Sequence, residues 1–234
     1  MDLPDFTSSL FWISVLQIIA IDIMLGGDNA VVIALACRKL PEDQRKKGIF
    51  WGVIGAIGLR VVLIFFALQL LALPYLKIIG GLLLLWIGVK LLIPEEDEHD
   101  GIEGGTTLFA AIKTIIVADA VMSLDNVIAV AGASHGSMFL VTFGILVSIP
   151  IVVWGSKIVL ALMDKFPIVI TLGAALLGWI AGGMMLTDPV FPASVAKSIP
   201  YANYVFAAAG ALLVVAIGKF LANRQLAATP PREI

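Results

Sequence analysis

Cysteine, histidine and charged residues are all scarce in this sequence. Cys37 is the only cysteine, which excludes an intrachain disulfide and disfavours a thiolate metal site; near a helix end, it is interpreted as a small apolar filler. Charged residues make up 14% of the 234 residues, whereas soluble domains carry about 25%. Hydrophobic residues reach 60%. This composition excludes an ordinary soluble domain and indicates an integral membrane protein in a lipid bilayer.

Two further absences narrow the class of protein. No basic stretch lies outside the short loops between the apolar runs, so we expect no nucleic-acid partner. Asp2 and Asp5 precede the first apolar run without any positive residue, a pattern unlike the start of a signal peptide. We therefore expect the first apolar segment to be retained.

Seven apolar stretches are long enough to cross the hydrocarbon core, which needs about 20 helical residues. We expect these spans near residues 9–36, 48–71, 74–93, 107–133, 138–163, 167–187 and 202–221. The loop after the first span carries five basic residues between Arg38 and Lys47, which predicts a cytoplasmic loop by the positive-inside rule. Alternation from that loop predicts an N-terminus outside and a C-terminus in the cytoplasm.

The first and fourth apolar stretches carry acids and amides in the same arrangement. One constant offset of 97 relates the two sets, which are Asp22, Asp28 and Asn29 in the first and Asp119, Asp125 and Asn126 in the fourth. An ionised aspartate at membrane depth costs about 2.5 to 3.5 kcal/mol on insertion scales. Four of them at matched positions indicate a functional site.

The similarity between the two halves extends beyond the acids. Gly52 near the start of the second span matches Gly144 in the fifth, and Gly80 in the third matches Gly173 in the sixth. Because each half has three spans, an odd number, the halves must have opposite orientations. Inverted repeats of this kind place the substrate site near the midplane, where the halves meet.

The predicted fold class is all-α: a polytopic membrane protein of seven transmembrane helices, with two inverted three-helix repeats and one C-terminal helix. We expect four parts. These are a first three-helix repeat at 1–93, an acidic cytoplasmic linker at 94–106, the second, inverted repeat at 107–187, and an outer loop, seventh helix and cytoplasmic tail at 188–234.

The glycines beside the first motif predict a local distortion. In an unbroken helix Asp22 and Asn29 lie within about 20° of each other, whereas Asp28 points away from them. A local unwinding at Gly26-Gly27 would redirect Asp28 and free backbone carbonyls to line a cavity. The second copy has Ser123-Leu124 at this place, so we expect a smaller break there and an asymmetric site.

The motif residues offer only oxygen ligands. Carboxylates and amides suit Mg²⁺, Ca²⁺ and Mn²⁺, whereas Zn²⁺ and Cu⁺ usually recruit histidine or cysteine. Met24 and Met122 flank the motifs, and a thioether ligand would favour Mn²⁺ over Mg²⁺, although methionine more often serves packing. Four ionised aspartates around one dication leave excess negative charge, so we expect some to be protonated in an empty site. Metal binding would then displace protons, which provides a route to cation/proton exchange.

One arginine lies about halfway along the second span. Arg60 cannot lose its charge there, so we expect it to pair with an aspartate or with helix-end carbonyls rather than to act as a gate. Five uncharged polar residues are candidates for the polar lining, although hydrogen bonding between helices is the commoner use of such residues: Gln17, Gln69, Thr114, Ser123 and Ser148.

The paired Asp-x5-Asp-Asn motifs, with Arg-Lys-Leu-Pro-x-x-Gln-Arg-x-Lys after the first, resemble the TerC family. The resemblance covers about residues 8–190. Short seven-span bacterial members of that family are described as manganese transporters. The resemblance implies efflux of Mn²⁺ from the cytoplasm across a bacterial cytoplasmic (inner) membrane, with Mn²⁺ as the transported ion and no resident cofactor. It also implies that the six motif residues form the metal site.

Other functions remain open at this point. They are an exporter of another divalent cation or of a small solute, a membrane assembly factor whose buried aspartates join helices, and an intramembrane aspartyl protease. Gly26-Gly27-Asp28 matches a protease motif loosely, but a protease has no evident need of a duplicated asparagine, so we expect no enzyme activity. The residues leave open the metal, the proton stoichiometry, the direct ligands and whether the chain forms a homo-oligomer.

Overall fold

The computed structural model describes residues 9–66, 70, 73–94, 107–133, 138–191 and 201–228. Within its helices, the side chains of residues 9–10, 14, 21–27, 125–133, 138 and 140–141 lie outside the description. Every element with given bounds is a helix: α1 (Ser9–Cys37), α2 (Glu42–Phe65), α4 (Leu76–Leu92), α5 (Leu108–Ala133), α6 (Met138–Lys165), α7 (Ile168–Leu186) and α9 (Ala202–Ala228). The protein is an all-α polytopic membrane protein.

A helix lies at each of the seven stretches expected from the sequence, although some bounds differ, as for α9, which ends at Ala228 rather than near 221. Helix α2 begins at Glu42, ahead of the expected span, because Pro41 stands at its N-cap and Glu42 and Asp43 complement the helix dipole in the first turn. Helix α1 runs unbroken through Gly26 and Gly27, so the expected unwinding there is wrong for this structure. In an apolar environment, broken backbone hydrogen bonds cost more than the weak helix propensity of two glycines.

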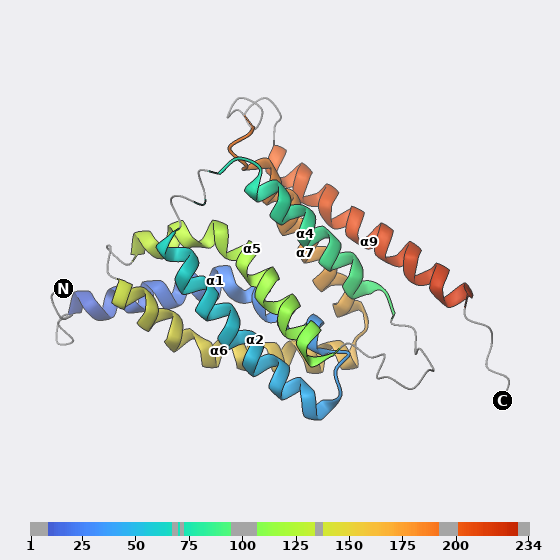
Figure 1. Ribbon diagram of the computed structural model, residues 1–234, viewed down its shortest axis with the longest axis horizontal. Coiled ribbons are helices and arrows are strands. Elements are labelled where there is room, and N and C mark those ends of the chain that lie inside the picture. The colour runs from blue at the N-terminus through green and yellow to red at the C-terminus, as the bar shows by residue number, and fades with distance from the viewer. Residues whose placement is uncertain are drawn as a thin grey trace.

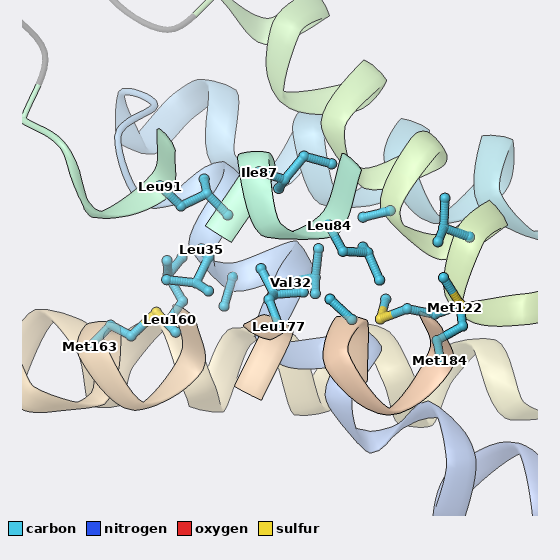
Figure 2. Close-up of a cluster of buried hydrophobic side chains, with 14 residues drawn as sticks. Val32, Leu35, Leu84, Ile87, Leu91, Met122, Leu160, Met163, Leu177 and Met184 are labelled. Carbon is cyan, nitrogen blue, oxygen red and sulfur yellow. The ribbon is translucent and has the colours of Figure 1, made fainter. Parts of the chain in front are cut away.

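The helices pack in two groups, which Figure 1 separates clearly. In the four-helix group, α1 lies along α6 and α2 lies along α5, while α1 also contacts α5. In the three-helix group, α7 packs against both α4 and α9. The two groups meet in an apolar cluster (Figure 2), whose labelled members are Val32, Leu35, Leu84, Ile87, Leu91, Met122, Leu160, Met163, Leu177 and Met184.

Glycines bring α9 into backbone contact with α7. A Cβ atom added to Gly178 or Gly182 would overlap the backbone of α9, and one added to Gly210 would overlap that of α7. Small residues at such positions let two membrane helices approach closely and gain dispersion contacts along their length. The approach joins α9 firmly to the three-helix group.

Basic residues of the α1–α2 loop tie three helix ends together. Arg38 Nη2 donates to the carbonyl of Leu91 at 2.8 Å, and Lys39 Nζ donates to that of Ile93 at 2.8 Å, so both cap the C-terminal end of α4. Arg45 forms an ion pair of 2.9 Å with Asp164 at the end of α6. The loop and the C-terminal ends of α4 and α6 therefore lie on the same side of the molecule.

A buried aspartate ties helix ends on the opposite side. Tyr75 at the N-cap of α4 has a φ of 68° and supplies no side-chain cap. Asp188, just after α7, takes that role: its carboxylate accepts backbone N–H groups of Tyr75 at 2.9 Å, Lys77 at 3.0 Å and Ile78 at 3.3 Å. It also accepts the N–H of Val190 at 2.9 Å. The start of α4 and the end of α7 are thus held together by one carboxylate.

The outer surface is apolar, with exposed side chains such as Trp51, Trp86 and Trp154. Surfaces of this kind are typical of contact with lipid. Of the described helices, four are long and apolar enough to cross a membrane: Glu42–Phe65, Thr142–Lys165, Ile168–Leu186 and Ala202–Gln225. Helix α4 has 17 residues, which corresponds to a length of about 25 Å.

Candidate functional site

A small pocket lies inside the four-helix group, and each of its helices contributes one polar side chain. These are Asn29 from α1, Arg60 from α2, Asp119 from α5 and Ser148 from α6. The pocket encloses about 20 Å³, room for roughly one water-sized sphere. Apolar side chains form the remaining wall: Ile33, Val53, Ala56, Ile57, Ile149 and Val152.

Arg60 pairs with Asp119 across the interface of α2 and α5. Nη2 of Arg60 donates to Oδ1 of Asp119, and Nε of Arg60 donates to Ser123 Oγ at 3.0 Å. Ser123 in turn donates to Oδ2 of Asp119 at 3.2 Å. All three residues are buried, with 6% or less of their surface exposed. The expected pairing of Arg60 with an aspartate is confirmed, and its partner is an acid of the second motif.

The first motif reaches the same pocket through Asn29. Its side chain is 3% exposed, and within the described part of the chain its Oδ1 atom accepts no hydrogen bond. A buried oxygen without a donor is costly unless a ligand or water satisfies it. The neighbouring Asp28 carboxylate accepts the backbone N–H of Asn29 at 3.1 Å, and its charge interacts with those of Asp119 and Arg60. Oxygens of both motifs therefore meet in one place.

The structure places one flanking methionine elsewhere. Met122 is 4% exposed and belongs to the apolar cluster between the two helix groups, together with Leu84 and Met184 (Figure 2). It does not line the pocket, so its placement is that of a packing residue. The side chains of six further predicted site residues lie outside the described ones: Asp22, Met24, Gly26, Gly27, Asp125 and Asn126.

The lining side chains that could hold a metal ion, those of Asn29, Asp119 and Ser148, offer oxygen atoms for it. Among the residues that the structure describes, no group of three or more His, Cys, Asp or Glu side chains is gathered in one place. Asp28, Asp119 and the Asn29 amide nevertheless supply the oxygen types that hard divalent cations prefer. Around Asn29 and Asp119, the apolar wall keeps the local dielectric low, which strengthens the interaction between Asp119 and Arg60.

Comparison with known proteins places the chain in a family. The profile of the Integral membrane protein TerC family matches residues 7–226, nearly the whole chain. The chain belongs to the TerC family of integral membrane proteins. No solved structure shows a significant match to it.

Several bacterial relatives cover most of this TerC chain. It is 47% identical over 178 residues to the Uncharacterized membrane protein YjbE of Bacillus subtilis. The aligned region covers 76% of this chain and 81% of YjbE. A second Bacillus subtilis protein, YceF, is 25% identical over 97% of this chain and 91% of its own length. The UPF0053 inner membrane protein YgdQ of Escherichia coli is 25% identical over 85% of this chain and 90% of YgdQ.

Sequence reasoning found the charged residues of the site but missed its apolar wall. The small and branched residues Val53, Ala56 and Ile57 recur at helical spacing with Arg60 on α2, which would have marked the face that lines the pocket. Asp188 was not predicted either, although an acidic residue directly after an apolar helix is a signal that the sequence offers.

Proposed function

We propose that this TerC protein transports a divalent cation, with Mn²⁺ as the favoured substrate, and exports it from the cytoplasm in exchange for protons. One observation carries the proposal: a single buried pocket joins Asn29 of the first motif to Asp119 of the second. Two acid-bearing segments, 90 residues apart between these positions, would have little reason to converge around an unsatisfied amide oxygen in a purely structural core. The preference for Mn²⁺ and the outward direction follow the resemblance of the motifs to manganese transporters.

The proposed architecture is seven spans with two inverted three-helix repeats. Contacts between the halves support it, because α1 pairs with α6 and α2 pairs with α5, an exchange that a two-fold relation requires. A Cβ atom on Gly52 would meet Ile115 at 2.5 Å, and one on Gly144 would meet Ile18 at 2.5 Å. Ile18 and Ile115 are related by the same offset of 97 as the acidic motifs.

The proposed orientation places the α1–α2 loop in the cytoplasm. The contacts of Arg38 and Arg45 gather the ends of α4 and α6 on that side, while Asp188 joins the start of α4 to the end of α7 on the other. Both sets fit strict alternation of the seven helices. The relative YgdQ is named an inner membrane protein, which supports the same location here.

The proton exchange follows from charge in a low dielectric. Asp28 and Asp119 interact electrostatically within the four-helix group, and a dication would neutralise charge that protons or Arg60 otherwise balance. Binding of the dication would therefore release protons from neighbouring carboxyl groups. We propose that these protons travel against the metal through the same site.

Transport by purified protein in liposomes tests the proposal. Vesicles loaded with a pH dye receive Mn²⁺, Mg²⁺, Ca²⁺ or Zn²⁺ in turn, and metal flux and internal pH are followed together. We expect Mn²⁺ flux with a coupled pH change. Asp119→Asn should lower that flux at least about tenfold, because a charge-assisted contact contributes about 1.5 to 3 kcal/mol.

The matched control is Ser156→Ala. Ser156 is a buried serine of α6 that bonds its own helix at Val153 and does not line the pocket, so its variant should transport normally. Folding of both variants is checked by monodispersity in detergent. Undiminished flux through a well-folded Asp119→Asn protein would contradict the proposed site. Absence of flux through the wild-type protein would contradict the transporter and favour an assembly role, in which the buried acids only join helices.

A further inference from the structure

Both carboxylate oxygens of Asp119 are engaged by protein donors. Oδ1 accepts from the guanidinium of Arg60, and Oδ2 accepts from Ser123 at 3.2 Å. Arg60 also holds Ser123 through its Nε atom at 3.0 Å, which closes a ring of three side chains. A cation that used Asp119 as a ligand would share this carboxylate with two donors, and of these the positively charged guanidinium is the one that it repels.

A guanidinium and a dication bound to the same carboxylate repel each other. Arg60 lies 6% exposed in the wall of a pocket with room for about one water-sized sphere, so water screens their repulsion poorly. Arginine keeps its charge at any physiological pH, so it cannot yield by losing a proton. It can yield only by moving away from Asp119.

We propose that Arg60 is a built-in cation, which neutralises Asp119 whenever the transported ion is absent and releases it when the ion binds. The proposal rests on the transport function proposed above and adds a role for Arg60 in the return of the empty carrier. Among the described side chains that line the pocket, Arg60 supplies the positive charge. Loss of Arg60 therefore makes the empty site more negative by one charge.

This charge matters for one half of the transport cycle. Exchange of one metal ion for another needs only the metal-loaded carrier, whereas net efflux also needs the metal-free carrier, with the protons it holds, to return. Each additional elementary charge that moves through the membrane field changes the equilibrium about 50-fold per 100 mV. The two modes should therefore respond differently to loss of Arg60.

Liposomes that hold labelled Mn²⁺ separate the two modes. Release into medium with unlabelled Mn²⁺ measures exchange, and release into metal-free medium at a fixed membrane potential measures net efflux. We expect Arg60→Gln to retain exchange while its net efflux falls at least about tenfold and becomes more dependent on voltage. Ser156→Ala, outside the pocket, should perform both modes as the wild type does.

Arg60→Lys provides the second variant. It keeps the charge but loses the Nε donor to Ser123, so net efflux should persist if charge is what matters. Net efflux lost in Arg60→Lys while exchange persists would overturn the proposal, even if Arg60→Gln failed to fold. An equal fall of both modes in a folded Arg60→Gln protein would overturn it as well. Wild-type liposomes that release no metal in either mode would instead overturn the transport function, and the role of Arg60 with it.

Discussion

Two adjacent glycines of α7 should respond in opposite ways to the same small substitution. A Cβ atom on Gly182 would overlap the carbonyl oxygen of Phe206 and lie 2.7 Å from its carbonyl carbon, both in the backbone of α9. A Cβ atom on Gly183 would find its nearest neighbour, Ala207 Cβ, at 4.0 Å. One methyl group thus meets an unyielding backbone in the first case and ordinary space in the second.

The expected magnitudes follow from this geometry. Overpacking of a well-filled contact costs about 1 to 3 kcal/mol, and a backbone neighbour cannot rotate away, so the upper half of that range applies to Gly182→Ala. Alanine in place of glycine inside a helix contributes about 1 kcal/mol of stability, which Gly183→Ala should gain in full. Because both variants gain the same helix propensity, they should differ in stability by the overpacking cost alone, about 2 to 3 kcal/mol.

Thermal unfolding in detergent, followed by circular dichroism, measures this difference. At about 2 to 4 °C per kcal/mol for a chain of this size, Gly182→Ala should unfold roughly 5 to 10 °C below Gly183→Ala. The fluorescence of Trp179, whose ring centroid lies 6.3 Å from that of Tyr204 on α9, reports the separation of the two helices independently. Equal unfolding temperatures, or a lower one for Gly183→Ala, would refute the backbone contact between α7 and α9.

Asp188 gives the remaining predictions. Asp188→Ala leaves four backbone N–H groups without their acceptor and should destabilise the protein by about 2 to 4 kcal/mol, between the loss of one helix cap and that of several buried charge-assisted bonds. Asp164→Ala, which removes an exposed ion pair, should cost under about 1 kcal/mol, and equal losses in the unfolding temperature would argue against the cap. Burial by itself raises the pKa of Asp188. The hydrogen bonds from four backbone N–H groups together lower the pKa by more than burial raises it, so it lies below its ordinary value of 3.8; they come from Val190, Tyr75, Ile78 and Lys77. The ionised carboxylate therefore contributes its full stability above about pH 4 and loses it as the pH falls through the lowered pKa. Unfolding temperatures of the wild type and Asp188→Asn should differ at pH 7 and converge in acid; a constant difference would contradict this linkage.

The positions of the helices were predictable because local sequence decides them in an apolar chain. In lipid, every backbone N–H and C=O group of a run such as 168–186 must find its partner inside the protein. A helix pairs these groups within the run itself and is therefore its low-energy conformation. The start of α2 was harder to predict, since the six residues from Glu42 to Lys47 are polar and their helix depends on the cap at Pro41. Helix α1 is unbroken at Gly26 and Gly27 because backbone pairing in an apolar environment outweighs their weak helix propensity.

Partners across the helix interfaces were not predictable in the same way. The sequence indicated that Arg60 needs a counter-charge, but four aspartates stood as candidates, and only the packing of α2 against α5 selects Asp119. Met122 and Ser123 are neighbours in the chain, yet the rotation of α5 turns one into the apolar cluster and the other toward Arg60. Asp188 gained its role because the end of α7 lies beside the start of α4.

By itself, the sequence determined the membrane class of this protein, the places of its helices and the duplication of its acidic motifs, because hydrophobicity, helix length and residue spacing are properties of the chain alone. The tertiary structure alone decided that Asn29 and Asp119 line one pocket, that Arg60 pairs with Asp119 and that one carboxylate caps a helix from another segment. Such contacts join residues far apart in sequence, and their free energy depends on which surfaces meet when the helices pack.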